Sequence, residues 1–152
     1  LRYEDVHQSQ KICIISLDKK RSLCYYSRIM LPKLNVNLDT LRPELRILEP
    51  LVDKVYQEFG LVAICTSTND GKHRVHSFHY LDAAFDLRVK LLSGPNEQRC
   101  LWLRLRGAID EAHPGLYDVF LEDAGGNNAH IHIEPSPKLA ATMNWEEKHV
   151  VG

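Results

Sequence analysis

The segment HSFHYLDAAFDLRV, residues 76–89, mixes ionisable and apolar side chains in a strand-like run. In its second half, Phe85 and Leu87 point to one face of a strand, while Asp86 and Arg88 point to the other. A carboxylate on a half-buried strand is unfavourable unless a partner compensates it. The segment therefore predicts a strand whose polar face belongs to a functional site.

Two later segments show the same alternation of apolar and ionisable residues. In YDVFLE, residues 117–122, Tyr, Val and Leu oppose Asp, Phe and Glu. In HIHIE, residues 130–134, both isoleucines oppose both histidines and the glutamate. Six of the eight histidines of the chain lie between residues 73 and 132. This concentration indicates that the polar faces of the three strands together form one site.

The composition is that of a folded globular protein with one domain. The chain has 152 residues, of which 44% are hydrophobic and 26% charged, and its formal net charge is −1. A nearly neutral chain has no basic excess with which to bind nucleic acid. No stretch reaches the length of a membrane span, about 18–20 apolar residues. We therefore expect neither nucleic acid nor a membrane among its partners, and we expect a monomer.

The cysteines and an apolar run near the start of the sequence indicate the cellular compartment in which the protein is made. Four cysteines are spread along the chain without a CxxC pair, which predicts reduced thiols rather than a disulfide framework or a thiolate zinc site. The apolar core of KICIISLDKK, residues 11–20, is short, is interrupted by charges and precedes no small-residue cleavage site. We therefore expect a protein without a signal peptide that is cytoplasmic on synthesis.

Regular patterning begins only near Met30. Residues 1–29 show no clean period, although KICIISL within them could pair at the edge of a sheet. We expect residues 1–29 to be an N-terminal extension or an added edge strand, and residues 30–152 to form the compact domain.

Helical periods alternate with strand signals over the rest of the chain. Apolar residues recur at three- and four-residue steps over residues 40–59, with Asp39 or Thr40 as the cap, Gly60 as the stop and Pro50 as a kink or division. A buried strand is expected over LVAICTST. A second helix is expected over PNEQRCLWLRLRGAID, with its leucines and tryptophan in the core. Two helices and several strands predict an α+β fold, with a small antiparallel or mixed sheet packed against helices.

The polar faces carry the residues of a catalytic metal site. Two neutral imidazoles and one carboxylate form a standard ligand set for Zn²⁺ that leaves one position for water, and His79, Asp86 and His132 can supply it. A bound zinc ion lowers the pKa of its water to about 7. Glu122 is the candidate general base, and His130 can stabilise a developing oxyanion.

Two motifs resemble those of a known enzyme family. SFHYLDAAFD, residues 77–86, resembles SxHxxGxAxD, the first zinc motif of the D-alanyl-D-alanine carboxypeptidase and L-alanyl-D-glutamate endopeptidase family. HIH resembles the closing HxH motif of that family, and YDVFLE with HIHIE is similar to the ending of its small phage-type members. AHIH also occurs in the related hedgehog signalling domain. The resemblance covers roughly residues 34–135 and implies a hedgehog-like fold.

The resemblance also assigns roles residue by residue. His79, Asp86 and His132 match the zinc ligands, Glu122 matches the catalytic glutamate and His130 the first histidine of HxH. The implied activity is that of a zinc metallopeptidase, which hydrolyses a peptide bond in the stem or cross-link peptides of bacterial peptidoglycan. A phage endolysin or virion wall hydrolase, acting at the cell wall after release, fits these expectations.

The chain departs from the family pattern at two places. Asp82 stands at the glycine of the first motif, which predicts a strained or differently shaped turn. The loop DAGGNN, residues 123–128, is longer than the expected hairpin, and it makes Asp123 a rival of Glu122 for the role of base. Either change could lower activity or alter the choice of substrate.

Three further residues are candidates for substrate binding. The planar guanidinium of Arg88 could bind a substrate carboxylate, or it could pair with Asp82 or another acid. Ser77 is expected to orient the motif by hydrogen bonding. His73 could contact metal or substrate, or it could be a solvated loop histidine.

Other functions are compatible with the same residues. The groove could bind a peptide without cutting it, as a zinc-containing module of the hedgehog type, and Asp82 with the longer loop favours this alternative. A cupin-like metal protein is a third hypothesis, because HIHIE offers HxH and a nearby glutamate. The plainest alternative is an exposed polar strand face without any metal.

Overall fold

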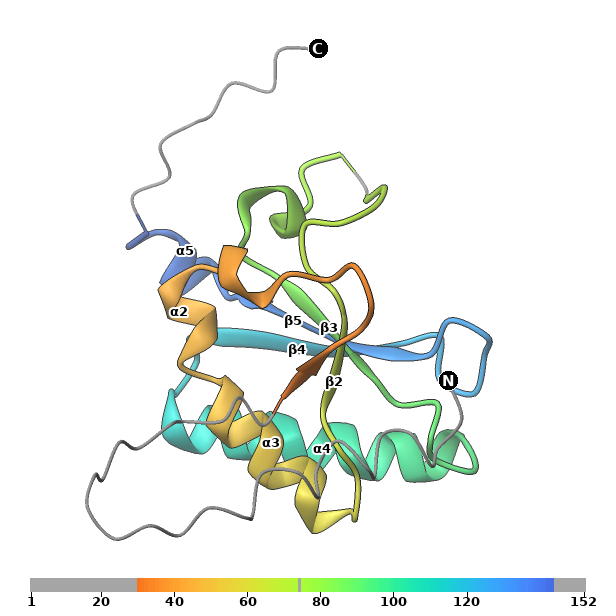
Figure 1. The fold of residues 1–152 in the computed structure, drawn as a ribbon. Helices are drawn as coiled ribbons and strands as arrows, with labels where there is room; N and C mark the ends of the chain where they lie inside the picture. The colour runs from red at the N-terminus through yellow and green to blue at the C-terminus, as the bar shows by residue number, and fades with distance from the viewer. Residues whose placement is uncertain (1–29, 74, 144–152) are drawn as a thin grey trace, which may run out of the picture.

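Five strands of the described residues form one mixed sheet at the centre of the fold (Figure 1). The computed structural model describes residues 30–73 and 75–143, so the predictions made for residues 1–29 lie outside the described residues. The strands are β1 (Leu31–Pro32), β2 (Ile64–Ser67), β3 (Phe85–Arg88), β4 (Tyr117–Glu122) and β5 (His130–Pro135). They are ordered β1-β2-β3-β5-β4, with β1 and β2 parallel and every other pair antiparallel. The predicted α+β fold with a mixed sheet is confirmed, and this open sheet is not the barrel that a cupin requires.

Helices and short helical turns join the strands. They are η1 (Leu38–Thr40), α2 (Pro43–Arg46), α3 (Glu49–Glu58), η2 (Phe78–Leu81), α4 (Pro95–Ala112) and α5 (Pro137–Ala140). Figure 1 shows α3 and α4 together on one side of the sheet, whereas η2 lies on the opposite side. In the part of the chain that the structure describes, no helix is long and apolar enough to cross a membrane.

The first helical region is divided into two helices, as Pro50 predicts. Pro50 lies in the first turn of α3, where its missing N–H is tolerated, so α2 ends before it and α3 begins a new helix. The expected cap at Asp39 or Thr40 is wrong. The N-cap of α2 is Arg42, whose side chain makes no capping hydrogen bond, while Asn37 caps η1 by accepting from Asp39 N at 2.9 Å.

The apolar face of the sheet packs against α3 and α4. Fully buried members of this core include Phe85, Leu87, Ile131 and Ile133 of the sheet and Val52, Val55, Leu101 and Leu105 of the helices. Burying each side chain of this size contributes about 1.5–3 kcal/mol. This face therefore holds the strands rigidly in register, and the opposite face is free to carry polar groups.

Two expectations for the apolar residues need correction. Residues 78–81 form the 3-10 helix η2 rather than part of a strand, so that β3 is short and begins at Phe85. Leu103 is 57% exposed instead of lying in the core, because it falls on the outer side of α4. Trp102 is partly buried as expected, and its indole N–H donates to Val119 O at 2.9 Å.

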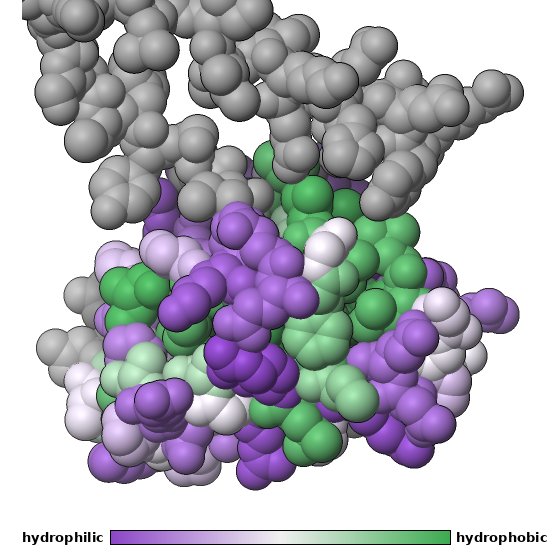
Figure 2. Space-filling view, turned by 90° about the horizontal axis from the view of Figure 1, so that it is seen from below, coloured by the Kyte–Doolittle hydropathy of each residue, from purple (hydrophilic) through white to green (hydrophobic). Residues whose placement is uncertain are grey.

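The helical side of the molecule has a mixed surface. Figure 2 shows this side from below, with hydrophobic residues gathered right of centre and hydrophilic residues on both sides of them. One element of the hydrophilic surface is the ion pair between Arg104 and Glu58, with Nε and Oε2 2.8 Å apart. The two cysteines in the described residues, Cys65 and Cys100, are free thiols.

Candidate metal centre

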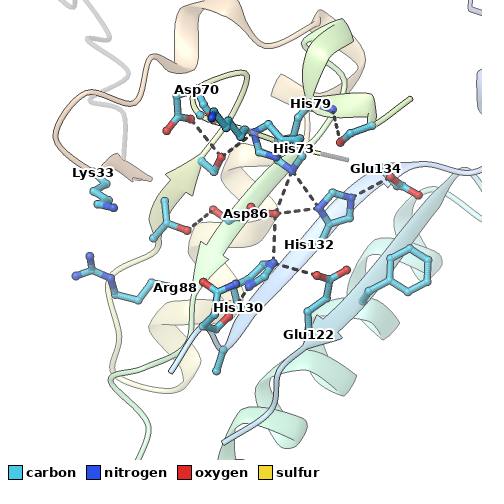
Figure 3. A pocket seen from close by; sticks show the side chains of 18 of the residues that line it. Lys33, Asp70, His73, His79, Asp86, Arg88, Glu122, His130, His132 and Glu134 are labelled. Atoms are coloured by element: carbon cyan, nitrogen blue, oxygen red, sulfur yellow. Dashed lines mark hydrogen bonds and ion pairs between the residues drawn. The ribbon is translucent and has the colours of Figure 1, made fainter. Parts of the chain in front are cut away.

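His79, Asp86 and His132 bring one ligand atom each to a common point. Asp86 Oδ1 lies 2.9 Å from His132 Nδ1 and 3.3 Å from His79 Nε2, and the two imidazole nitrogens are 3.2 Å apart. The three side chains converge from η2, β3 and β5 (Figure 3). Their ligand atoms lie within 4.8 Å of one another, so this group could hold a metal ion.

The register of the sheet places two of the three ligands. Asp86 of β3 pairs directly with His132 of β5, and Phe120 of β4 pairs with His132 on its other side. Side chains directly opposite on antiparallel strands have Cβ atoms about 4.5–5.5 Å apart. The alternation read from the sequence and the strand pairing are therefore sufficient to bring a carboxylate and an imidazole together.

The third ligand, His79, is positioned by the 3-10 helix η2. Ser77 caps this helix, and its hydroxyl accepts from His79 N at 3.3 Å, which is the orienting role expected of it. The His79 side chain is buried, and its Nδ1 is hydrogen-bonded to Thr68 O. The ring of His73 stacks on that of His79, with centroids 4.0 Å apart and planes 9° from parallel. These contacts fix the imidazole with Nε2 toward Asp86.

Asp82 ends η2 in a left-handed conformation, with φ 57° and ψ 23°. This is the position at which the SxHxxGxAxD motif has glycine, and aspartate is one of the few other residues that adopt this conformation with a small penalty. Its side chain accepts from Asn69 Nδ2, and its carbonyl accepts from Arg42 N at 2.9 Å. Asp82 is not among the described residues that line the cavity, so it shapes the turn without entering the site.

The hydrogen bonds behind the two imidazoles determine where their protons lie. Thr68 O can only accept, so the neutral ring of His79 carries its proton on Nδ1 and presents a lone pair at Nε2. His132 Nε2 lies 2.9 Å from Glu134 Oε2, so its proton is on that side and Nδ1 faces Asp86. With neutral rings, three acceptor atoms face one another. Such an arrangement requires a shared cation, which is either an added proton or a metal.

The pKa values show how strongly the cluster attracts a cation. Burial alone would raise the pKa of Asp86, but hydrogen bonds from His132 and His79 and the neighbouring imidazoles hold that pKa well below its usual value. Burial would lower the pKa of His132, but its hydrogen bonds to Asp86 and Glu134 raise that pKa to about 9. In the absence of a metal, the cluster therefore retains a proton at neutral pH.

Glu122 and His130 lie beside the metal-binding group. They are opposite each other in the register of β4 and β5, and His130 Nε2 is 3.4 Å from Glu122 Oε2 and 3.8 Å from Asp86 Oδ1. His130 Nδ1 donates to Asn128 O at 2.6 Å. The side chain of Glu122 is 55% exposed, so its carboxylate can reach a bound molecule. The structure thus brings both predicted catalytic residues next to the predicted ligands.

Asp123, the rival for the base, closes the loop between β4 and β5 instead. Its carboxylate accepts from Asn128 N at 2.8 Å, and its carbonyl accepts from Gly126 N at 2.8 Å. A Cβ at Gly126 would lie 2.1 Å from Asp123 Oδ1, so any other residue there would displace the Asp123 carboxylate from its present position. Asp123 is absent from the described lining of the cavity, which leaves Glu122 as the carboxylate nearest His130.

The group lies in a cavity of about 820 Å³. Phe120 forms part of its wall, 44% exposed, with its ring centroid 6.3 Å from that of His132. Arg88 also lines the cavity and does not pair with Asp82, which binds Asn69. His73 lines it as well, held by Tyr80, whose hydroxyl both accepts from His73 N at 2.8 Å and donates to His73 O at 3.0 Å.

Sequence reasoning assigned no role to Thr68 or Phe120, and it considered Glu134 only in the cupin-like hypothesis. The support that Glu134 gives to His132 could have been found, because strand alternation puts both on one face, two residues apart. Thr68 acts through its backbone carbonyl, which no side-chain pattern reveals. Phe120 interrupts a polar face, and an exposed aromatic residue at that position is a signal of ligand contact.

Comparisons of the chain with protein-family models, with curated proteins and with solved structures find no match. The metal-binding group is therefore argued from the chain's own residues, and the family to which its motifs point stays a prediction.

Proposed function

We propose that the protein is a zinc-dependent metallopeptidase that hydrolyses a peptide bond in the stem or cross-link peptides of bacterial peptidoglycan. The observation that carries the proposal is the convergence of His79 Nε2, Asp86 Oδ1 and His132 Nδ1, with the Glu122–His130 pair beside them. Three metal ligands and an adjacent carboxylate that can move a proton are the elements of a hydrolytic zinc site.

Zinc is the metal that best fits this set of ligand atoms. Two imidazoles and a carboxylate at about 2.0–2.2 Å from Zn²⁺ would occupy three tetrahedral positions, whose mutual separation would be about 3.3–3.6 Å. The three atoms are 2.9–3.3 Å apart in the structure, close to that separation. Each histidine also has an acceptor behind it, Thr68 O or Glu134 Oε2, which is the usual support of a zinc-binding imidazole. Little rearrangement is needed for binding.

The residues beside this group would perform the proton transfers. When bound, zinc supplies a Lewis acid that polarises the peptide carbonyl and acidifies water. Glu122 takes the proton of the attacking water and delivers it to the amine that leaves, since its exposed carboxylate can reach both. His130, when protonated between Glu122 and Asp86, presents Nε2–H to the oxygen on which negative charge develops.

The substrate class rests on the two motifs and their placement. SFHYLDAAFD and HIHIE resemble the zinc motifs of peptidoglycan peptidases, and their ligands lie on η2, β3 and β5 around one cavity. We infer a hedgehog-like arrangement of this α+β domain. The setting would be that of a phage endolysin or virion wall hydrolase, which acts at the cell wall after release.

A second candidate function is a zinc-containing module that binds peptides without cutting them. The observation that favours it is the 55% exposure of the Glu122 side chain, whose ion-pair partner His130 is no nearer than 3.4 Å. A general base that is held loosely would give slow turnover while the cavity still binds a peptide.

Metal-dependent release of peptides from purified peptidoglycan distinguishes the two functions. The protein is prepared with one equivalent of zinc, confirmed by mass spectrometry of the metal, and is incubated with walls of several peptide chemistries. Soluble fragments that disappear with a chelator and in Glu122→Gln, but persist in Glu111→Gln on the exposed side of α4, support the peptidase. Peptide binding with full zinc content and no fragments from any wall supports the binding module.

A further inference from the structure

The cavity contains four cationic side chains that no carboxylate of the described residues neutralises. They are Lys33, Lys72, Arg88 and Lys90. The four carboxylates of the same cavity already have other partners, which are histidines for Asp86, Glu122 and Glu134 and residues 67–68 for Asp70. Within residues 30–73 and 75–143, no ion pair joins any of these cations to an acid. The cavity therefore has positive charge available for a ligand.

Arg88 is the cation most closely tied to the metal-binding group. It lies two residues from Asp86 on β3, on the same face, and pairs in register with His130. Two residues of a strand advance about 7 Å, so its Cα lies about that far from the Cα of the carboxylate ligand. Its carbonyl accepts from the Tyr56 hydroxyl at 3.1 Å, which ties the strand here to the core. The side chain thus projects from a fixed point into the cavity.

Lys33 adds a second positive charge to the cavity. It follows β1, which flanks β2 on the side opposite β3. Its N–H donates to Cys65 O at 2.8 Å and continues the pairing of β1 with β2. In Figure 3, Lys33 and Arg88 lie on the same side of the cluster, whereas Glu134 lies on the opposite side. Two like charges that face one cavity repel each other, and an anion between them removes that repulsion.

We propose that Arg88 and Lys33 form an anion subsite that binds a carboxylate of the peptide substrate about one residue from the hydrolysed bond. The inference rests on the proposed function. The planar guanidinium accepts a carboxylate through two parallel hydrogen bonds, and the ammonium adds charge. One residue of extended peptide spans about 3.5 Å. A charge-assisted hydrogen bond adds about 2.8 Å. The Cα of Arg88 is anchored about 7 Å from that of Asp86, so a carboxylate one residue from the hydrolysed bond is within reach of its long side chain.

Such a carboxylate could belong to either side of the cleaved bond, and matched peptides separate the two sources. In the first pair, the residue that leaves carries either a free α-carboxylate or a carboxamide. In the second pair, the residue that supplies the carbonyl has either glutamate or glutamine as its neighbour. Replacing a carboxylate by a carboxamide keeps size and shape while removing the charge.

The test compares kcat/KM for both pairs in the zinc-loaded full chain. In one of the two pairs, kcat/KM for the peptide with the carboxylate is expected to exceed that for the carboxamide peptide about 10- to 100-fold. This is the range for a hydrogen bond to a charged group. This preference is expected to be largely lost in Arg88→Gln and reduced in Lys33→Gln. It stays unchanged in Lys54→Gln, which removes the same charge from the exposed side of α3. Equal rates for acid and amide in both pairs overturn the subsite.

A binding measurement separates this inference from the proposed activity. Arginine Nε–H signals are followed by NMR while the zinc-loaded protein is titrated with N-acetyl-D-alanine or its carboxamide. A shift of the Arg88 signal with the acid alone supports the subsite, even if no peptide is cleaved and the peptidase proposal fails. Identical behaviour with acid and amide, in a protein that cleaves peptides, overturns the subsite and leaves the peptidase standing.

Discussion

The two faces of the central sheet use the same strands for opposite purposes. Phe85 and Leu87 are fully buried on the face covered by α3 and α4, while Asp86 between them reaches the cavity. On β5, Ile131 and Ile133 are fully buried, and His132 between them binds Asp86. Polar and apolar groups only one residue apart thus experience different environments, because successive side chains of a strand point in opposite directions.

This division has a mechanical consequence. The apolar face is held by many contacts and needs no ion, whereas the polar face gathers acceptors that repel one another unless a cation joins them. The rigidity required of a metal centre is supplied by the residues behind it. Substitutions on one face should therefore change stability, and those on the other should change metal binding and activity.

The largest effect is expected from His132→Ala. Without Nδ1 of His132 only two ligands remain, so stoichiometric zinc binding is lost, as measured by metal content after gel filtration. Zinc raises the midpoint of thermal unfolding of the unaltered protein and leaves that of the variant unchanged. The matched control is His113→Ala at the end of α4, which keeps its zinc. Full metal content in His132→Ala would remove His132 from the ligand set.

On the opposite face, Ile133→Ala tests the buried side of the same strand. Removing a fully buried isoleucine costs about 2–5 kcal/mol of the free energy of unfolding, measured by urea denaturation. The zinc content of the folded variant stays at one equivalent, since its neighbours on the polar face are unchanged. Loss of zinc at unchanged stability would contradict the separation of the two faces.

Glu122→Gln probes the proton transfer separately from the metal. The amide keeps the shape of the side chain but cannot take a proton, so hydrolysis is expected to slow about 100-fold or more at constant zinc content. The rate of release of peptide fragments provides the measurement. A near-normal rate would show that another group is the base, and Asp123→Asn would then identify whether the loop residue has that role.

If the cluster binds zinc as proposed, the proton that it holds should make that binding depend on pH. The pKa of His132 in the metal-free protein is about 9, so one proton leaves when zinc binds at neutral pH, and the apparent affinity rises about tenfold per pH unit until the pH approaches that pKa. This raised pKa stabilises the metal-free fold below about pH 6.5, and the contribution is lost as pH rises through about 9.

Calorimetry in two buffers of different ionisation enthalpy counts that proton. Close to one proton per zinc is expected at pH 7, and fewer in Glu134→Gln, because the carboxylate of Glu134 contributes to the raised pKa of His132. Zinc binding that is independent of pH between 6 and 9 would contradict this account.

The sequence predicted the polar face better than the turn that completes it. Alternation on β3, β4 and β5 depends only on neighbouring residues, and the ladder Asp86–His132–Phe120 follows once these strands pair. The path from Ser77 to Asp82 depends on Arg42 and on the neighbouring residues Thr68 and Asn69, which lie in two other segments of the chain, and no local pattern contains that information. A strand was therefore expected where a 3-10 helix carries His79.

The smallest effect is expected at Asp82, which ends η2. Glycine relieves the left-handed backbone but adds chain entropy and loses the hydrogen bond to Asn69, so Asp82→Gly changes the free energy of unfolding by at most about 1 kcal/mol. Alanine loses the same hydrogen bond without relieving the backbone, so Asp82→Ala is expected to be less stable than Asp82→Gly by about 1–2 kcal/mol. Urea denaturation of both variants measures this difference. Equal stabilities would show that the left-handed turn carries no strain, and both variants should retain zinc because Asp82 shapes the turn from outside the cavity.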